Sequence, residues 1–171
     1  MVKNPSLLHH LRDILILPFT VTVVIPYYIL RRSGSGFNDW IANPDPQILI
    51  GAALGLMGLS LLLYTVFLFR TIGKGTLAPW TPKKKLVVAG PYRYCRNPMI
   101  TGVLLILAGE ALFFHSTGLL IWAVSFFAIN MLYFTVYEEP DLEERFGEDY
   151  REYKRHVPRW MPKMRPYKTK P

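Results

Sequence analysis

Two adjacent carboxylates, Glu138 and Glu139, are candidates for a functional site because of the residues that surround them in the sequence. They follow a long uncharged stretch, and residues 70–97 before it hold seven Lys or Arg and no acid. A Gly-Lys-Gly sequence at 73–75 gives that basic segment backbone freedom and exposed amides. Negative charge beside a basic, glycine-containing segment suggests a polar ligand bound between them. The plainer interpretation is that the two carboxylates mark the end of a membrane span.

The cysteine and histidine residues give little support for a metal site or a reactive thiol. The single cysteine, Cys95, excludes a disulfide framework and a Cys-rich zinc site, and we interpret it as a space-filling residue rather than a reactive thiol. The four histidines show no metal-binding spacing such as H-E-x-x-H, so we expect no metal site. No side chain is an obvious general base, and the sequence therefore assigns no catalytic residue.

The elements that must position these residues are strongly apolar. The chain has 171 residues, which predicts one domain spanning residues 1–171. Hydrophobic residues make up 51% and charged residues 19%, which excludes a disordered chain and argues against an ordinary soluble enzyme. The net charge of +8 would suit nucleic acid or anionic lipid. Because the charges lie between apolar runs, we expect the bilayer as a partner and no nucleic acid.

Four apolar runs, at residues 14–30, 47–69, 98–115 and 117–137, have the length of membrane spans. A bilayer core needs about 17–25 mainly apolar residues per helix. The sequence therefore predicts an all-α polytopic membrane protein with about four transmembrane helices. Pro18 and Pro26 predict kinks in the first of them.

The distribution of Lys and Arg predicts the orientation. Residues 70–97 and the tail after Tyr137 are rich in Lys and Arg, whereas the connection at 116–118 has none. We expect the basic segments and both termini in the cytoplasm of a multi-pass protein of the plasma (inner) membrane. In the second run, Gly51, Gly55 and Gly58 line one helix face. Packing inside the bundle is the simpler interpretation, and a homodimer seam is the alternative.

The tail predicts a C-terminal amphipathic helix on the cytoplasmic end of the bundle. Its apolar residues recur at helical spacing, and Pro158 should end the helix. They are Leu142, Phe146, Tyr150, Tyr153 and Val157. Pro140 should push Glu139 away from helical geometry. Residues 163–171 are expected to form a loose basic end.

An ordered set of motifs resembles the isoprenylcysteine carboxyl methyltransferases and the phosphatidylethanolamine N-methyltransferase branch of integral membrane methyltransferases. The pattern L-V-x-x-G-x-Y-x-x-x-R-x-P-x-x-x-G runs from Leu86 to Gly102. Glu138-Glu139 follows, and F-G-x-x-Y-x-x-Y-x-x-x-V-P runs from Phe146 to Pro158. Together with the glycines at 73 and 75, the matches cover about residues 73–158.

The resemblance implies an S-adenosylmethionine-dependent methyltransferase with a cytoplasmic cofactor pocket and an acceptor that enters from the bilayer. The cofactor-binding residues that it implies are Lys84, Lys85, Leu86, Val87, Tyr92, Asn97, Pro98, Met99, Ile100 and Glu138. Their chemistry fits this cofactor. Glu138 can accept hydrogen bonds from its amino group or ribose hydroxyls, and Arg93 or Arg96 can pair with its carboxylate. The ring of Tyr92 or Tyr94 can stack on adenine.

Two departures from the family pattern bear on the acceptor. The His and Tyr of R-H-P-x-Y-x-G are Asn97 and Ile100 here. Phe134 stands where the carboxyl methyltransferases have an Arg that holds the substrate carboxylate. We therefore expect a lipid-like or small hydrophobic acceptor, and isoprenylcysteine should be a poor one. The alternatives are an NADPH-binding membrane reductase and a non-catalytic membrane protein with a vestigial pocket.

Glu110 lies within the third apolar run, where an ionisable side chain is costly. It is about 18 Å along a helix from Pro98 at 1.5 Å per residue, which is far from a cytoplasmic pocket. We expect a structural partner such as Asn130. A place in the acceptor tunnel is the alternative.

Overall fold

The computed structural model describes residues 15–33, 46–68, 71–72 and 86–167 of the chain. All regular secondary structure in these segments is helical, which confirms the all-α prediction for the described part of the chain. The elements are η1 (Leu15–Val24), α2 (Ile25–Ser33), α4 (Pro46–Leu68), η3 (Gly90–Arg93), α5 (Pro98–Phe113), α6 (Thr117–Tyr133), η4 (Phe134–Glu138) and α7 (Glu139–His156).

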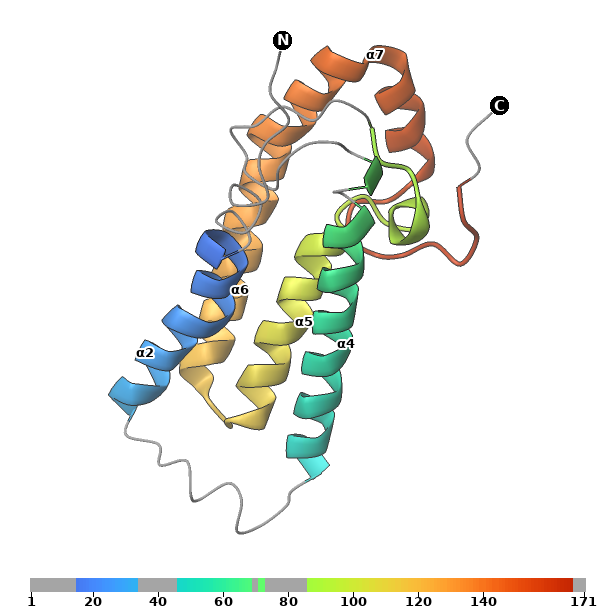
Figure 1. The fold of residues 1–171 in the computed structure, drawn as a ribbon. Helices are drawn as coiled ribbons and strands as arrows, with labels where there is room; N and C mark the ends of the chain where they lie inside the picture. Colours follow the sequence, from blue (N-terminus) through green and yellow to red (C-terminus); the bar gives the residue numbers. More distant parts are fainter. Residues whose placement is uncertain (1–14, 34–45, 69–70, 73–85, 168–171) are drawn as a thin grey trace.

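Figure 1 shows the long helices side by side as a bundle, with α5 between α4 and α6, and with η1 and α2 beside α6. The last residue of α4, the first residue of α5 and the last residue of α6 lie at one end of this bundle, and α7 arches over that end. We call it the site end. It is the end at which the segment 86–97 also lies.

Two helices are long and apolar enough to cross a membrane. They are α4 and the continuous helix of Thr117–His156, which begins as α6. The apolar helix α5 has 16 residues and spans about 24 Å at 1.5 Å per residue, short of a bilayer core of about 30 Å. Two of the four predicted runs therefore form helices long and apolar enough to span a membrane, and the count of four spans stays a prediction.

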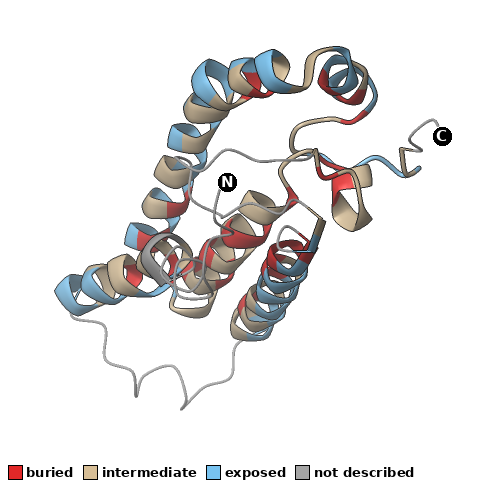
Figure 2. Ribbon diagram, turned by 45° about the horizontal axis from the view of Figure 1, so that its top comes forward, coloured by how far each residue is buried: buried red, intermediate tan, exposed pale blue. Residues whose placement is uncertain are grey.

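The outward faces of these helices are apolar, as expected where lipid is the solvent. Leu49, Leu56, Leu63 and Phe67 of α4 are all exposed. Figure 2 shows buried residues on the sides of α4 and α5 that face each other and exposed residues on the outer side of α4. The core between the helices contains Leu62, Val66, Val103, Leu107 and Ala123.

Glycines bring α4 and α5 into direct backbone contact. A Cβ on Gly58 would lie 2.6 Å from the Gly102 carbonyl oxygen, and one on Gly51 would lie 2.7 Å from that of Gly109. Real Cβ atoms do not approach so closely, so these positions need glycine at this helix separation. A Cβ on Gly55 would meet nothing within 4 Å. Packing inside the bundle is thus confirmed for Gly51 and Gly58.

The predicted proline effect in the first run takes the form of a π-helical stretch, η1, which contains Pro18. In a π-helix the carbonyl of each residue accepts a hydrogen bond from the N–H five residues later. The carbonyl of Val21 would therefore pair with residue 26, but Pro26 has no N–H to donate. The indole Nε1–H of Trp122 on α6 donates to that carbonyl instead, at 3.1 Å. A side chain of a neighbouring helix therefore satisfies the carbonyl that the proline leaves unpaired.

The C-terminal helix differs from its prediction in two respects. The prediction that Pro140 pushes Glu139 out of helical geometry is wrong, since Glu139 has φ −69° and ψ −43°. The preceding turn, η4, is π-helical, and in it the Glu139 N–H donates to Phe134 O. The predicted single helix is also bent, since Gly147 has φ 55° and ψ −129° and divides α7 into two arms. This conformation is open to glycine and strained for other residues.

Candidate functional site

The segment from Leu86 to Asn97 carries four of the ten predicted cofactor-binding residues and packs against α4. Its turn at η3 depends on Gly90, which has φ 52°. A Cβ on Gly90 would lie 2.7 Å from Leu68 Cδ1 and 3.0 Å from the Tyr64 hydroxyl. The positive φ therefore favours glycine at this position, whereas the close contacts are with the ends of the Leu68 and Tyr64 side chains.

Three of the predicted cofactor residues, Val87, Tyr92 and Met99, pack into one cluster with Leu68 and Ile72. Tyr92 is only 7% exposed. Burial raises the pKa of its hydroxyl, and the neighbouring Cys95 and Glu138 raise it further, so Tyr92 stays protonated. Of the two tyrosines considered for adenine stacking, Tyr94 is the exposed one, at 37%.

The two adjacent glutamates have different environments. Glu139 is 4% exposed and forms ion pairs with Arg96 at 2.9 Å, with Arg159 at 2.7 Å and with Lys154 at 3.2 Å. Although burial raises the pKa of its carboxyl, the hydrogen bonds from Arg159 and Lys154 and the charge of Arg96 outweigh this, so the pKa is lowered. Glu139 thus joins both arms of α7 to the segment 86–97 and to the chain beyond α7.

Glu138, the glutamate that was predicted to bind cofactor, is half-buried at the end of η4. Its carboxylate accepts a hydrogen bond from the Tyr133 hydroxyl, and its negative charge is one of the smaller causes of the raised pKa of Tyr92, after burial and Cys95. The structure therefore brings Glu138 to the same region as the cluster of Val87, Tyr92 and Met99. Glu139 is committed to the ion pairs with Arg96, Arg159 and Lys154.

The chain after α7, residues 158–167, is attached to the segment 86–97 by backbone hydrogen bonds. Arg96 N–H donates to Pro158 O at 2.9 Å, and Lys163 N–H donates to Tyr94 O at 3.0 Å. Tyr167 N–H donates to Arg93 O at 2.9 Å. The prediction of a loose end from residue 163 is therefore wrong for residues 163–167, and residues 168–171 lie outside the described part. We call residues 158–167 the tail.

The two arginines considered for the cofactor carboxylate have protein partners. Arg93 Nε donates to Tyr167 O at 2.7 Å. Arg96 Nη1 lies 2.9 Å from Glu139 Oε1 and donates to the Tyr150 hydroxyl at 3.4 Å. Arg96 Nε, however, is buried with no hydrogen-bond partner in the described part of the chain. A buried donor of this kind is costly unless an acceptor reaches it, and a water or a ligand oxygen can supply that acceptor.

The remaining predicted site residues are placed as follows. Leu86 packs on the α7 cluster of Leu142, Tyr150, Tyr153 and Val157. Asn97 is the N-cap of α5, Pro98 is its buried first residue, and Ile100 is half-buried in its first turn. Lys84 and Lys85 lie outside the described residues.

Sequence reasoning missed Arg159, a cation close to Phe134. Arg159 Nη1 donates to Thr135 Oγ1 at 2.6 Å and lies 3.6 Å from Met131 Sδ. The ring of Trp160 packs edge-on against Phe134 at 6.0 Å between centroids. The sequence contained one indication that this part of the chain is ordered. Arg159 is surrounded by Pro158, Trp160 and Pro162, a composition that is unusual for a loose tail.

The expected partner of Glu110 is wrong. Asn130 Nδ2 donates to Phe126 O of its own helix at 2.8 Å. Glu110 Oε2 is buried with no hydrogen-bond partner among the described residues. The structure therefore does not provide the structural pair that would explain this residue.

A comparison with protein families gives one match. The family model described as phospholipid methyltransferase matches residues 46–149, which is more than half of the chain. The matched region begins at the first residue of α4, includes the segment 86–97 and ends in the second arm of α7. Neither a curated protein nor a solved structure matches the chain.

Proposed function

The chain belongs to the phospholipid methyltransferase family, and from this premise we propose that it transfers a methyl group from S-adenosylmethionine to a lipid-like or small hydrophobic acceptor at the membrane. The observation that carries the proposal is the family match over residues 46–149, which includes all of α4, most of the helix Thr117–His156 and the whole segment 86–97. The family and the two apolar helices make the chain a membrane methyltransferase. The cofactor and the acceptor are the proposal.

The residues at the site end fit this cofactor. Arg96 Nε is a buried donor that lacks a partner among the described residues, and a cofactor carboxylate would supply the acceptor. Glu138 would accept from the amino group or the ribose hydroxyls, and the exposed ring of Tyr94 would stack on adenine. When bound, S-adenosylmethionine supplies an electrophilic methyl group on a sulfonium.

The apolar predicted residues would form the wall of the same site. These are Leu86, Val87, Tyr92, Pro98, Met99 and Ile100, with Asn97 at the helix start. Lys84 and Lys85 complete the proposed set. Methyl transfer is an in-line displacement, so the main task of these residues is to orient the reactants and exclude water. The packing of Val87, Tyr92 and Met99 against α4 supports a rigid wall suited to that task.

We propose four spans with both termini in the cytoplasm of an inner-membrane protein, because the basic segment 70–97 and the basic tail would then share one side. The common location of the segment 86–97 and α7 at one end of the bundle supports this orientation. The acceptor would approach between the helices and present an uncharged or amine group. Phe134 and Trp160 support that choice, since an apolar site disfavours a desolvated carboxylate.

Binding of the cofactor is tested by calorimetry with S-adenosylhomocysteine on the purified full chain. We expect 1:1 binding, and Glu138→Ala should weaken it by about 12- to 150-fold, which corresponds to about 1.5–3 kcal/mol for a charge-assisted hydrogen bond. Glu144→Ala on an exposed position of α7 is the matched control. Binding of NADPH in place of S-adenosylhomocysteine would favour a reductase, and binding of neither would favour a non-catalytic protein.

The acceptor is tested by methyl transfer to a panel that contains phospholipids, small thiols and an isoprenylcysteine analogue. We expect turnover on an uncharged or amine-bearing lipid to exceed turnover on the isoprenylcysteine analogue. The reverse order would show that a cation clamps the carboxylate after all, and Arg159 near Phe134 would then be the first residue to mutate.

A further inference from the structure

We propose that Trp160–Arg165 anchors the protein in the membrane interface by binding the phosphate groups of anionic phospholipids. This segment lies beyond the family match, which ends at residue 149, so the family does not account for it. The proposal is independent of methyl transfer. It rests on where the tail contacts α6 and on which of its side chains are exposed.

The contacts of Trp160 place the tail beside an apolar span. The Trp160 ring packs on Phe127 at 5.2 Å and on Phe134 at 6.0 Å between centroids, and its Nε1 lies 3.2 Å from Met131 Sδ. These three residues form one face of the helix that begins as α6, at i, i+4 and i+7. Phe127 lies about 9 Å before the end of α6 at 1.5 Å per residue. The tail therefore reaches along the span rather than away from it.

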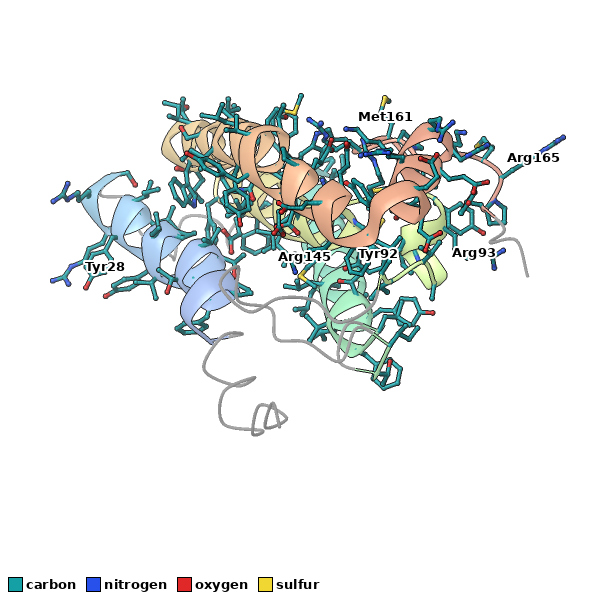
Figure 3. The ribbon with its side chains drawn as sticks, turned by 90° about the horizontal axis from the view of Figure 1, so that it is seen from above. Tyr28, Tyr92, Arg93, Arg145, Met161 and Arg165 are labelled. Carbon is teal, nitrogen blue, oxygen red and sulfur yellow. The ribbon has the colours of Figure 1, made fainter. Side chains whose placement is uncertain are left out.

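The side chains after Trp160 are exposed and apolar, in a place where a soluble protein would have polar ones. Met161 is 81% exposed and Met164 is 97% exposed. In Figure 3, which is seen from the site end, Met161 and Arg165 both point away from the body of the protein. A Trp beside a span and Met side chains directed outward are suited to the boundary between headgroups and acyl chains.

The positive charges of the segment Trp160–Arg165 favour anionic phospholipids as its partner. Lys163 and Arg165 are exposed and alternate with the two methionines, and residues 159–167 contain no acid. Each cation near a membrane surface favours anionic lipid, and Arg in addition suits bidentate contact with phosphate. Apolar insertion alone would suit any bilayer, whereas this charge pattern favours phospholipids with a net negative headgroup.

The backbone holds the anchor in register with the candidate site. Lys163 N–H donates to Tyr94 O at 3.0 Å, and Tyr167 N–H donates to Arg93 O at 2.9 Å. These bonds leave the side chains of Lys163 and Arg165 directed outward, so they can be substituted without removing a backbone contact. The anchor would thus fix the depth of the segment 86–97 relative to the bilayer surface.

The test measures the depth of nitroxide labels on the full chain in lipid nanodiscs. Labels are attached at Met161→Cys and at Met164→Cys, each in a Cys95→Ser background, and at Arg151→Cys on exposed α7 as the control. Collision with oxygen and with a nickel chelate reports depth. In discs that contain phosphatidylglycerol, we expect oxygen to dominate at 161 and 164 and the nickel chelate to dominate at 151.

The charge dependence is tested with Lys163→Gln/Arg165→Gln and with discs of phosphatidylcholine alone. Each lost cation should lower the ratio of inserted to water-exposed tail about five-fold in phosphatidylglycerol discs, the equivalent of about 1 kcal/mol, and thus about 25-fold for the pair. An unchanged thermal midpoint of the double variant shows that the fold is retained. In phosphatidylcholine discs the double variant should match the parent.

Three results would overturn the proposal. Labels at 161 and 164 could be as accessible to the nickel chelate as the label at 151, which would place the tail in water. They could be shielded from both reagents, which would indicate a protein partner or a second copy. Insertion could also be equal in both lipid compositions and unchanged by the double variant, which would exclude recognition of anionic headgroups.

Discussion

The Tyr153 hydroxyl donates a 2.6 Å hydrogen bond to the backbone carbonyl oxygen of Tyr92, and both side chains are buried. Tyr153 lies on the second arm of α7, and Tyr92, one of the proposed cofactor residues, lies in the segment 86–97. Burial raises the pKa of the Tyr153 hydroxyl, and nearby Cys95 and Tyr92 raise it further. The hydroxyl therefore remains a donor across the physiological pH range.

Tyr153→Phe should destabilise the protein, because the Tyr92 carbonyl would be left buried without that donor. We expect a loss of about 1–3 kcal/mol in the free energy of unfolding. Thermal unfolding in detergent measures it, with Tyr137→Phe at an exposed position as the control. If both variants unfold at the same temperature, this hydrogen bond contributes nothing net to stability.

Glu139→Gln and Glu138→Gln should have different effects although the residues are neighbours. Removal of the Glu139 charge leaves Arg96 and Arg159 without their buried partner, and breaking a buried ion pair costs about 3–5 kcal/mol. Glu138→Gln should instead weaken S-adenosylhomocysteine binding with a smaller change in stability. Unfolding and calorimetry on both variants separate the roles. A stable Glu139→Gln variant that binds no cofactor analogue would reverse our assignment.

Stability should also depend on pH through Glu139. Its pKa is lowered in the folded state, so its contribution is fully present above the unfolded value of about 4.3 and is lost as the pH falls through the folded value. We expect the difference in thermal midpoint between the parent and Glu139→Gln to be constant from pH 7 to about pH 5. It should shrink below about pH 4.3. A constant difference down to pH 3 would contradict the assignment.

Gly58→Ala should be much more damaging than Gly55→Ala, one turn away on the same helix. A Cβ at position 58 would overlap the α5 backbone, and we expect overpacking to cost about 1–3 kcal/mol. A Cβ at position 55 meets nothing within 4 Å, and alanine favours a helix over glycine by about 1 kcal/mol. Thermal unfolding of the two variants checks this. Equal effects would mean that α4 and α5 are less closely packed than described.

The helices could be predicted well from the sequence because their boundaries follow composition. The run at 47–69 became α4, and the run at 117–137 became α6 and most of η4, since long uncharged stretches have few alternatives to a helix in lipid. Gly51 and Gly58 were predictable as packing residues for the same reason. The bend at Gly147 was not, because a glycine in a polar helix has the same sequence pattern whether or not the backbone turns there.

The site was predictable in part. Val87, Tyr92 and Met99 of the motif pack into one cluster, and their role in binding a cofactor stays a prediction. The ion pairs of Glu139 with Arg96 and Arg159 were not predictable, because they join residues that are 43 and 20 positions apart and depend on how α7 bends. The backbone hydrogen bonds of the tail were also missed, because nearly every residue has the same backbone donor and acceptor and the residue types do not show which of them pair.

The bond between Tyr167 N–H and Arg93 O has a consequence for biosynthesis. The two residues are 74 positions apart, and the later one leaves the ribosome after every helix of the bundle has been made. At about 5–20 residues per second, the nascent segment around Arg93 waits for about 4–15 s before its partner exists. During that interval the helices can enter the bilayer while the segment 86–97 still lacks its contacts with the tail. Membrane insertion can therefore begin before this end of the protein has reached its final structure.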